Sequence, residues 1–97
     1  MTTPLERIVR REPRLATFVH DGRLTRIPRR PAVAAKLYAA TAAELTPEVT
    51  MSETEINNLL RPIWSDVSTL RRALVDHGHL RRSADGSRYE RSDSTGG

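Results

Sequence analysis

Residues 51–91 read MSETEINNLLRPIWSDVSTLRRALVDHGHLRRSADGSRYER, and this stretch decides the fold of the chain. Apolar residues recur at helical spacing in its first part, whereas its last part consists of two short extended runs around a turn. The stretch therefore predicts two short helices followed directly by a two-stranded hairpin. We expect an α+β fold that is mainly helical.

The first of these helices has a clear start. Ser52 followed by Glu55 is a capping box, in which each side chain bonds the backbone N–H of the other residue. Met51 and Ile56 form the matching hydrophobic staple, and Pro62 ends the pattern. The inward face is predicted to consist of Ile56, Leu59, Leu60 and Ile63.

The second helix is predicted to span about residues 66–77. Ser65 or Asp66 caps it, and Gly78 is the left-handed residue that ends it. A turn of about 100° per residue places an apolar stripe on one side, made of Val67, Leu70, Leu74 and Val75. The opposite side carries Ser68, Thr69, Arg72, Ala73 and Asp76.

Arg71 falls on the apolar stripe of this helix. We expect its stem to pack against the core, because a long aliphatic stem can cover apolar surface while its charged head stays polar. Its guanidinium is expected to pair with the carboxylate of Glu55 or Asp66. A structural role is therefore favoured over contact with nucleic acid.

The hairpin covers residues 79–91 and is centred on Asp85-Gly86. Asp-Gly is a preferred pair for a two-residue type I′ turn, in which Gly86 accommodates a positive φ. The resulting register pairs Arg82 with Tyr89 and Arg81 with Glu90, and it places Leu80 and Tyr89 on the core side.

The ends of the chain are expected to lie outside the main domain. Residues 1–14 are polar and contain a short helix that Pro13 must end. Residues 92–97 are small and polar, and we expect a disordered tail. The main domain then covers residues 15–91.

Between the extension and the capping box, the sequence predicts a turn, a strand and a helix. The turn is at Asp21-Gly22, and the strand covers residues 23–27. Pro31 opens a helix over about residues 31–45, where its missing N–H costs nothing. Three core helices with a C-terminal hairpin are the parts of a winged helix-turn-helix, a scaffold that most often binds nucleic acid.

The net charge of +4 is distributed unevenly. Residues 1–36 carry nine Lys or Arg against three acids, residues 37–69 one against five, and residues 70–97 six against four. All but one of the basic residues are Arg, which suits phosphate and guanine edges. Because GC-rich coding produces the same bias without any ligand, this charge indicates an anionic partner only weakly.

Several classes of function are disfavoured. Without cysteine there is no disulfide framework or thiol chemistry, and His20, His77 and His79 lack the spacing of a metal site. Since there is no glycine-rich phosphate loop or nucleophile motif, we expect no enzyme activity and no cofactor. No apolar run approaches the roughly 20 residues of a membrane span, and no signal peptide is recognisable. We therefore expect a cytoplasmic protein.

Spaced motifs along the chain match those of a known family. They are Phe18-x-x-Asp21-Gly22-x-Leu24-x-x-Ile27-Pro28, Thr54-Glu55-x-Asn57, Asp66-x-x-Thr69-Leu70-Arg71-Arg72-x-Leu74-Val75-Asp76-x-Gly78-x-Leu80-x-Arg82 and Gly86-x-x-Tyr89. Over about residues 15–90 the chain resembles a small bacterial domain of unknown function, found alone or fused to helix-turn-helix regulators of the arsenical-resistance-repressor type. The resemblance implies a winged-helix-like fold and a link to transcription. Arg29-Arg30-Pro31 stands where a Lys-bearing segment is expected in relatives.

In a winged helix, the helix at 66–77 would enter the major groove of DNA and the hairpin would rest on the backbone. The candidate contacts to double-stranded DNA are Ser68, Thr69 and Arg72 on the helix, Arg81, Arg82 and Arg88 on the hairpin, and Arg29 and Arg30 before residue 31. We expect these clusters to converge beside the last helix. The competing interpretation of each cluster is a solvated charged surface.

Two other interpretations remain open. The same scaffold can dock another protein through its helices and its acidic middle segment, and the arginines would also permit binding to structured RNA. Trp64 is expected to be a core or inter-helix residue, whereas an exposed Trp64 would indicate a partner surface. A homodimer would compensate for the thin core of so short a chain.

Overall fold

The computed structural model describes residues 2–92. The helix α1 (Pro4–Arg11) begins at Thr3, whose hydroxyl accepts a hydrogen bond from the Glu6 N–H. A 3-10 helix η1 (Pro13–Phe18) follows. The short N-terminal helix predicted from the sequence is therefore present, and it ends before Pro13 as expected.

A small antiparallel hairpin joins β1 (Val19–His20) to β2 (Arg23–Leu24). Asp21 and Gly22 both have positive φ, 53° and 74°, as a type I′ turn requires. The strand predicted over residues 23–27 is shorter than expected. The chain leaves the ladder after Leu24, and the N–H and hydroxyl of Thr25 both donate to the Phe18 carbonyl.

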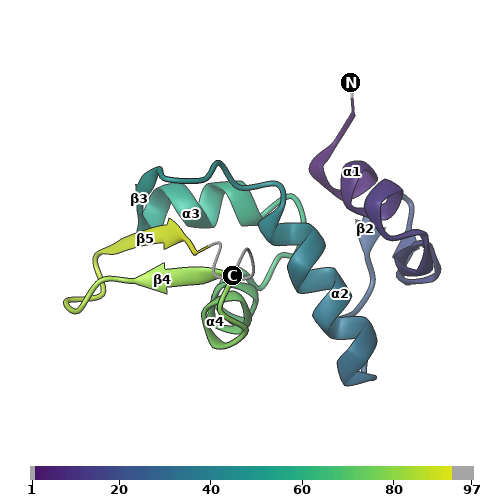
Figure 1. Ribbon diagram of the computed structural model, residues 1–97. Helices are drawn as coiled ribbons and strands as arrows, with labels where there is room; N and C mark the ends of the chain where they lie inside the picture. Colours follow the sequence, from purple (N-terminus) through teal and green to yellow (C-terminus); the bar gives the residue numbers. More distant parts are fainter. Residues whose placement is uncertain (1, 93–97) are drawn as a thin grey trace.

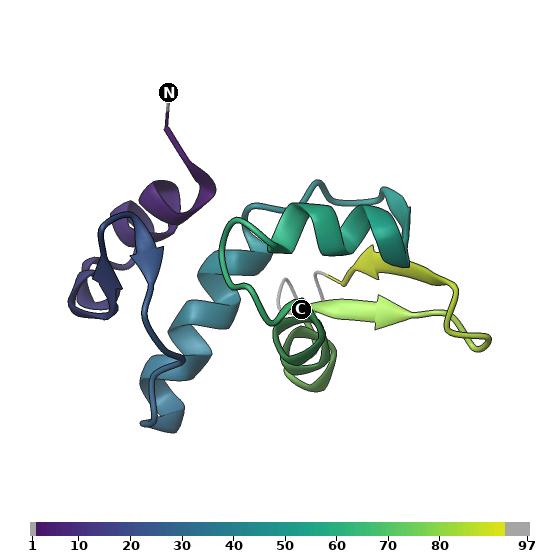
Figure 2. The same cartoon turned by 180° about the vertical axis from the view of Figure 1, so that it is seen from behind.

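The helix α2 (Pro31–Ala42) ends three residues before the predicted limit at Leu45. Its last turn tightens, because the N–H groups of Glu44 and Leu45 bond the carbonyls three residues back. Leu45 is nevertheless buried, as the sequence predicts. In Figures 1 and 2, α2 lies between α1, η1 and the first hairpin on one side and the remaining elements on the other.

The remaining elements are β3 (Thr50–Ser52), α3 (Glu53–Leu60), α4 (Val67–Asp76), β4 (Leu80–Arg82) and β5 (Arg88–Arg91). The three strands form one antiparallel sheet in the order β3-β5-β4. The sequence did not predict β3, because its residues overlap the capping box. The fold is α+β, as expected.

The capping box at the start of α3 is confirmed. Glu55 Oε1 accepts from the Ser52 N–H at 2.8 Å, and the Ser52 hydroxyl accepts from the Glu55 N–H at 3.1 Å. These bonds, with the backbone contribution first, lower the pKa of the Glu55 carboxyl. Ile56 and Leu60 are fully buried, whereas Leu59, predicted to face inward, is 47% exposed. Ile56 and Leu60 are four residues apart and lie on one narrow side of this short helix. The core covers only that side, so Leu59 stays exposed.

The helix α4 begins at Asp66, whose carboxylate accepts from the Thr69 N–H at 3.2 Å. Leu70 and Leu74 are fully buried. Gly78, with φ 80°, ends the helix as predicted. At this end the His77 ring packs on the Tyr38 ring, with centroids 4.7 Å apart, which joins α4 to α2.

The second hairpin has the predicted register, with Arg82 opposite Tyr89 and Arg81 opposite Glu90, and with Leu80 and Tyr89 buried. The turn itself differs from the type I′ prediction. Gly86 has φ 76°, but Asp85 is not left-handed, and the Gly86 N–H bonds the Ser83 carbonyl. The Asp85 carboxylate holds this turn instead, by accepting hydrogen bonds from Ser83 and Ser87.

The end of the chain departs slightly from the predicted tail at 92–97. The Ser92 N–H donates to the His79 carbonyl at 2.9 Å, so Ser92 still belongs to the folded domain. The rest of that predicted tail, residues 93–97, lies outside the described residues.

Candidate functional site

A groove of about 410 Å³ lies between α4 and the second hairpin. It brings together three of the residues selected from the sequence, since Ser68 and Arg72 line it from α4 and Arg82 lines it from β4. The other lining residues are Glu53, Arg71, Val75, Asp76 and Tyr89. The groove therefore joins the exposed face of the helix to the inner face of the hairpin.

The exposed face of α4 offers fewer free donors than the sequence suggests. The Thr69 hydroxyl donates to Asp66 at 2.7 Å, and this bond is the main cause of the lowered pKa of the Asp66 carboxyl. Thr69 is thus committed to the cap of the helix. The hydroxyl of Ser68 and the guanidinium of Arg72 bond no other group in the described part of the chain.

The three hairpin arginines have different surroundings. Arg81 pairs with Glu90 across the strands, with Nη2 and Oε1 2.6 Å apart. Arg82 has no carboxylate within 4 Å among residues 2–92, and its guanidinium lies over Gly86, where an added Cβ would be 2.5 Å from Nη2. Arg88 is exposed, and its charge contributes the last and smallest effect, after the Ser52 bonds, to the lowered pKa of Glu55.

Arg29 and Arg30 do not join this groove. Both are exposed at the start of α2, where Arg30 occupies the cap position without a side-chain hydrogen bond. In Figures 1 and 2 the start of α2 lies at the bottom of the molecule, well apart from the turn of the second hairpin, with α4 between them. The expectation that all the clusters converge beside the last helix is therefore wrong for Arg29 and Arg30. The hairpin, α4 and the start of α2 instead follow one another along the lower edge of the molecule in both views.

Arg71 is held by neighbouring groups, as its place on the apolar stripe predicts. Its side chain is only 15% exposed, its Nη2 lies 3.1 Å from Glu53 Oε1, and Nη1 donates to Asn57. The guanidinium also lies over the Tyr89 ring, 5.5 Å from its centroid. The predicted partners, Glu55 and Asp66, were wrong because both carboxylates are engaged by helix caps.

Ion pairing divides the basic residues into two groups. Those held by carboxylates include Arg7 and Arg11, which both bond the nearly buried Glu44. Among residues 2–92, the arginines whose side chains have neither a carboxylate within 4 Å nor a hydrogen bond are Arg10, Arg14, Arg23, Arg26, Arg29, Arg30, Arg72, Arg82 and Arg88. Arg23 and Arg26 are not among the contacts predicted from the sequence; Arg26 lies over the Phe18 ring, 5.3 Å from its centroid.

Among residues 2–92, no three His, Cys, Asp or Glu side chains lie close enough to hold a metal ion. None of the described helices has the length and apolar character to cross a bilayer.

Fold and surface together define a small α+β domain whose last helix and hairpin present arginines that pair with no carboxylate of residues 2–92. The chain belongs to the bacterial family described as "Uncharacterized protein conserved in bacteria (DUF2087)", which matches residues 23–91. The match extends from β2 to the end of β5 and leaves α1 and η1 outside it. Neither the curated proteins nor the solved structures gave a match.

Proposed function

We propose that this protein is a winged-helix DNA-binding protein that acts in transcriptional regulation. The order α2, β3, α3, α4, β4, β5 supports the winged-helix assignment, because it is helix, strand, helix, helix and then a hairpin wing. The third strand, β3, pairs with β5 and so attaches the wing to the helical core.

The observation that carries the proposal is the groove between α4 and the second hairpin. Arg72 and Arg82 line it from two elements, and neither has a carboxylate within 4 Å in the described part of the chain. With α4 in the major groove, Arg72 reaches base edges or phosphate, and Ser68 donates to phosphate. Arg82 and Arg88 then rest on the backbone beside the helix.

Arg29 and Arg30 extend this interface beyond the groove. The longest dimension of the molecule is 37 Å, close to the roughly 34 Å of one turn of B-DNA. With α4 centred on the major groove, the hairpin and the start of α2 meet backbone on either side of it. Arg29 and Arg30 act as the clamp on the side away from the hairpin.

Fluorescence anisotropy with labelled duplex DNA across a salt series tests the proposal. Each neutralised phosphate contributes about −0.9 to the slope of log affinity against log salt, so five contacts from Arg29, Arg30, Arg72, Arg82 and Arg88 give a slope of roughly −4.5. We expect measurable binding near 0.1 M salt and a steep loss above it. The absence of binding even at low salt would overturn the proposal.

A second candidate is a protein-interaction module. It is favoured by two exposed apolar side chains, Leu59 at 47% and Val49 at 43%, within the acidic segment 37–69. Large apolar side chains in an acidic surface suit a partner with a basic, apolar face. A photo-crosslinking residue at position 59 should then capture a protein in cells, while one at Arg10 on the distant α1 should not.

A further inference from the structure

A second groove, of about 560 Å³, lies away from α4's exposed face. Residues 22–25 of the first hairpin form one wall, and residues 61–65 of the connection between α3 and α4 form the other. In Figure 2 the first hairpin lies beside the upper part of α2, and the connection between α3 and α4 crosses in front of it. Its volume falls within the range of small-molecule sites, roughly 300–1,000 Å³.

The charge lining this groove is of one sign. Arg23 and Arg61 come from opposite walls, and no carboxylate is among the lining residues. The Arg23 guanidinium has no hydrogen bond or ion pair among residues 2–92, and the Arg61 guanidinium bonds only the neutral side chain of Asn58, at 3.0 Å. Two guanidinium groups without a counter-charge suit a carboxylate or phosphate oxygen pair.

The same groove contains an aromatic surface. Trp64 is partly buried against the core, and its indole N–H is neither hydrogen-bonded nor among the buried polar atoms of the described residues. Leu24 and Ile63, both buried, give the groove an apolar floor. An indole beside apolar side chains favours a flat ring, which stacks or packs edge-on against it.

We propose that this groove binds a small planar anion. The ring of the ligand lies against Trp64, and its carboxylate or phosphate bonds Arg23 and Arg61. Aromatic carboxylates and nucleoside monophosphates share this chemistry. The ligand contacts the segment that leads directly into Asp66, the cap of α4.

Because Trp64 is the only tryptophan of the chain, its fluorescence reports on the groove directly. The full chain is titrated separately with benzoate and with adenosine monophosphate, excited at the red edge of indole absorption. Saturable quenching or a spectral shift by either probe supports the site and identifies the source of the anion. No saturable change with either probe overturns it.

The anionic and aromatic parts are tested separately. Benzamide has the ring without the charge, and inorganic phosphate has the charge without the ring; either one binding as tightly as the better probe overturns the proposal. The double variant Arg23→Gln, Arg61→Gln should weaken that probe at least tenfold, while the matched double variant Arg72→Gln, Arg82→Gln should leave it unchanged. Equal affinity in the two variants overturns the assignment of the arginines. Thermal melting by circular dichroism confirms that both variants are folded.

Discussion

The guanidinium of Arg71 on α4 lies 3.1 Å from the carboxylate of Glu53 on α3. The same group bonds Asn57 and covers the Tyr89 ring of β5. One cationic side chain thus connects both helices to the sheet at the back of the groove that Arg72 lines.

Arg71→Glu should therefore destabilise the fold strongly. The variant loses the contacts with Asn57 and Tyr89 and places a second carboxylate beside Glu53, and breaking such a partly buried pair costs roughly 2–3 kcal/mol. For a domain of this size the melting temperature should fall by roughly 10 °C or more. Arg72→Glu, the same change one residue on and exposed, is the control and should shift melting little. An unchanged melting temperature for Arg71→Glu would refute its structural role.

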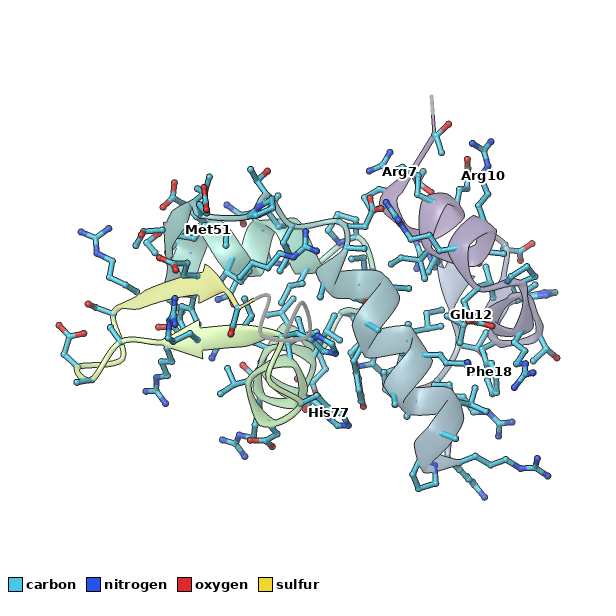
Figure 3. The ribbon with its side chains drawn as sticks, in the orientation of Figure 1. Arg7, Arg10, Glu12, Phe18, Met51 and His77 are labelled. Carbon is cyan, nitrogen blue, oxygen red and sulfur yellow. The ribbon has the colours of Figure 1, made fainter. Side chains whose placement is uncertain are left out.

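Arg72→Glu and Arg82→Glu should each weaken duplex-DNA binding, because each reverses a charge in the groove between α4 and the hairpin. A reduction of about tenfold or more at 0.1 M salt is expected, with a salt slope shallower by roughly 1 to 2. Arg10→Glu is the matched control, since Arg10 lies on α1, across α2 from α4 (Figure 3). Equal losses in all three variants would indicate a general charge effect and not an interface.

Ser52→Ala should remove one half of the capping box and cost about 1 kcal/mol of stability. In the unaltered chain the Glu55 N–H donates to the Ser52 hydroxyl at 3.1 Å. Without that hydroxyl it has no partner within the helix, and stability is lost. Chemical denaturation of the variant measures it. Ser68→Ala, on the exposed face of α4, should change stability by no more than a few tenths of a kcal/mol, and an equal effect of the two changes would contradict the capping assignment.

The turn of the second hairpin should respond to strong acid. Hydrogen bonds from the Ser83 hydroxyl, then from the N–H and hydroxyl of Ser87, lower the pKa of the Asp85 carboxyl from 3.8 to about 2. A depressed pKa means that this contribution to stability is present above pH 3.8 and is lost as the pH falls towards 2. Carboxyl carbon NMR should give a midpoint near 2, and Ser83→Ala should raise it. A midpoint near 3.8 in the unaltered chain would contradict these bonds.

Gly86→Ala should act on Arg82 as well as on the backbone. Gly86 and Gly22 have nearly equal positive φ, 76° and 74°, so alanine strains both by a similar amount, about 1 kcal/mol. Only at Gly86 does the new methyl meet the Arg82 guanidinium, whereas nothing lies within 4 Å at Gly22. DNA affinity should therefore fall in Gly86→Ala and not in Gly22→Ala. Similar affinities would show that the position of Arg82 does not matter for binding.

Local sequence signals predicted the elements whose causes are local. Ser52 and Glu55 identified the start of α3, and Gly78 identified the end of α4, because these bonds join residues a few positions apart. The hairpin register was also predicted, although its turn type was not, since Ser83 and Ser87 hold Asp85 in another conformation. The strand β3 was missed because its partner, β5, is almost forty residues away and its own three residues are too few to show a strand pattern.

The candidate site was less predictable, because ion pairing depends on tertiary contacts. Arg81 and Arg82 are adjacent and equivalent in the sequence, yet one pairs with Glu90 and the other lies in the groove. The acidic partner of Arg71 was predicted wrongly. Glu53 and Glu55 both lie in the first turn of α3, but the helix cap engages Glu55, and Glu53 pairs with Arg71. The spread of Arg29 and Arg30 away from the hairpin follows from the direction of α2, which no local pattern encodes.

The strand β5 is hydrogen-bonded on both sides, to β4 and to β3. The hairpin is therefore fixed along one edge by β3. Because β3 continues without a break into the first turn of α3, the hairpin is attached directly to that helix. A displacement of the hairpin turn therefore acts on α3 through the junction between Ser52 and Glu53. A ligand that shifts the hairpin would in this way also change the orientation of α3.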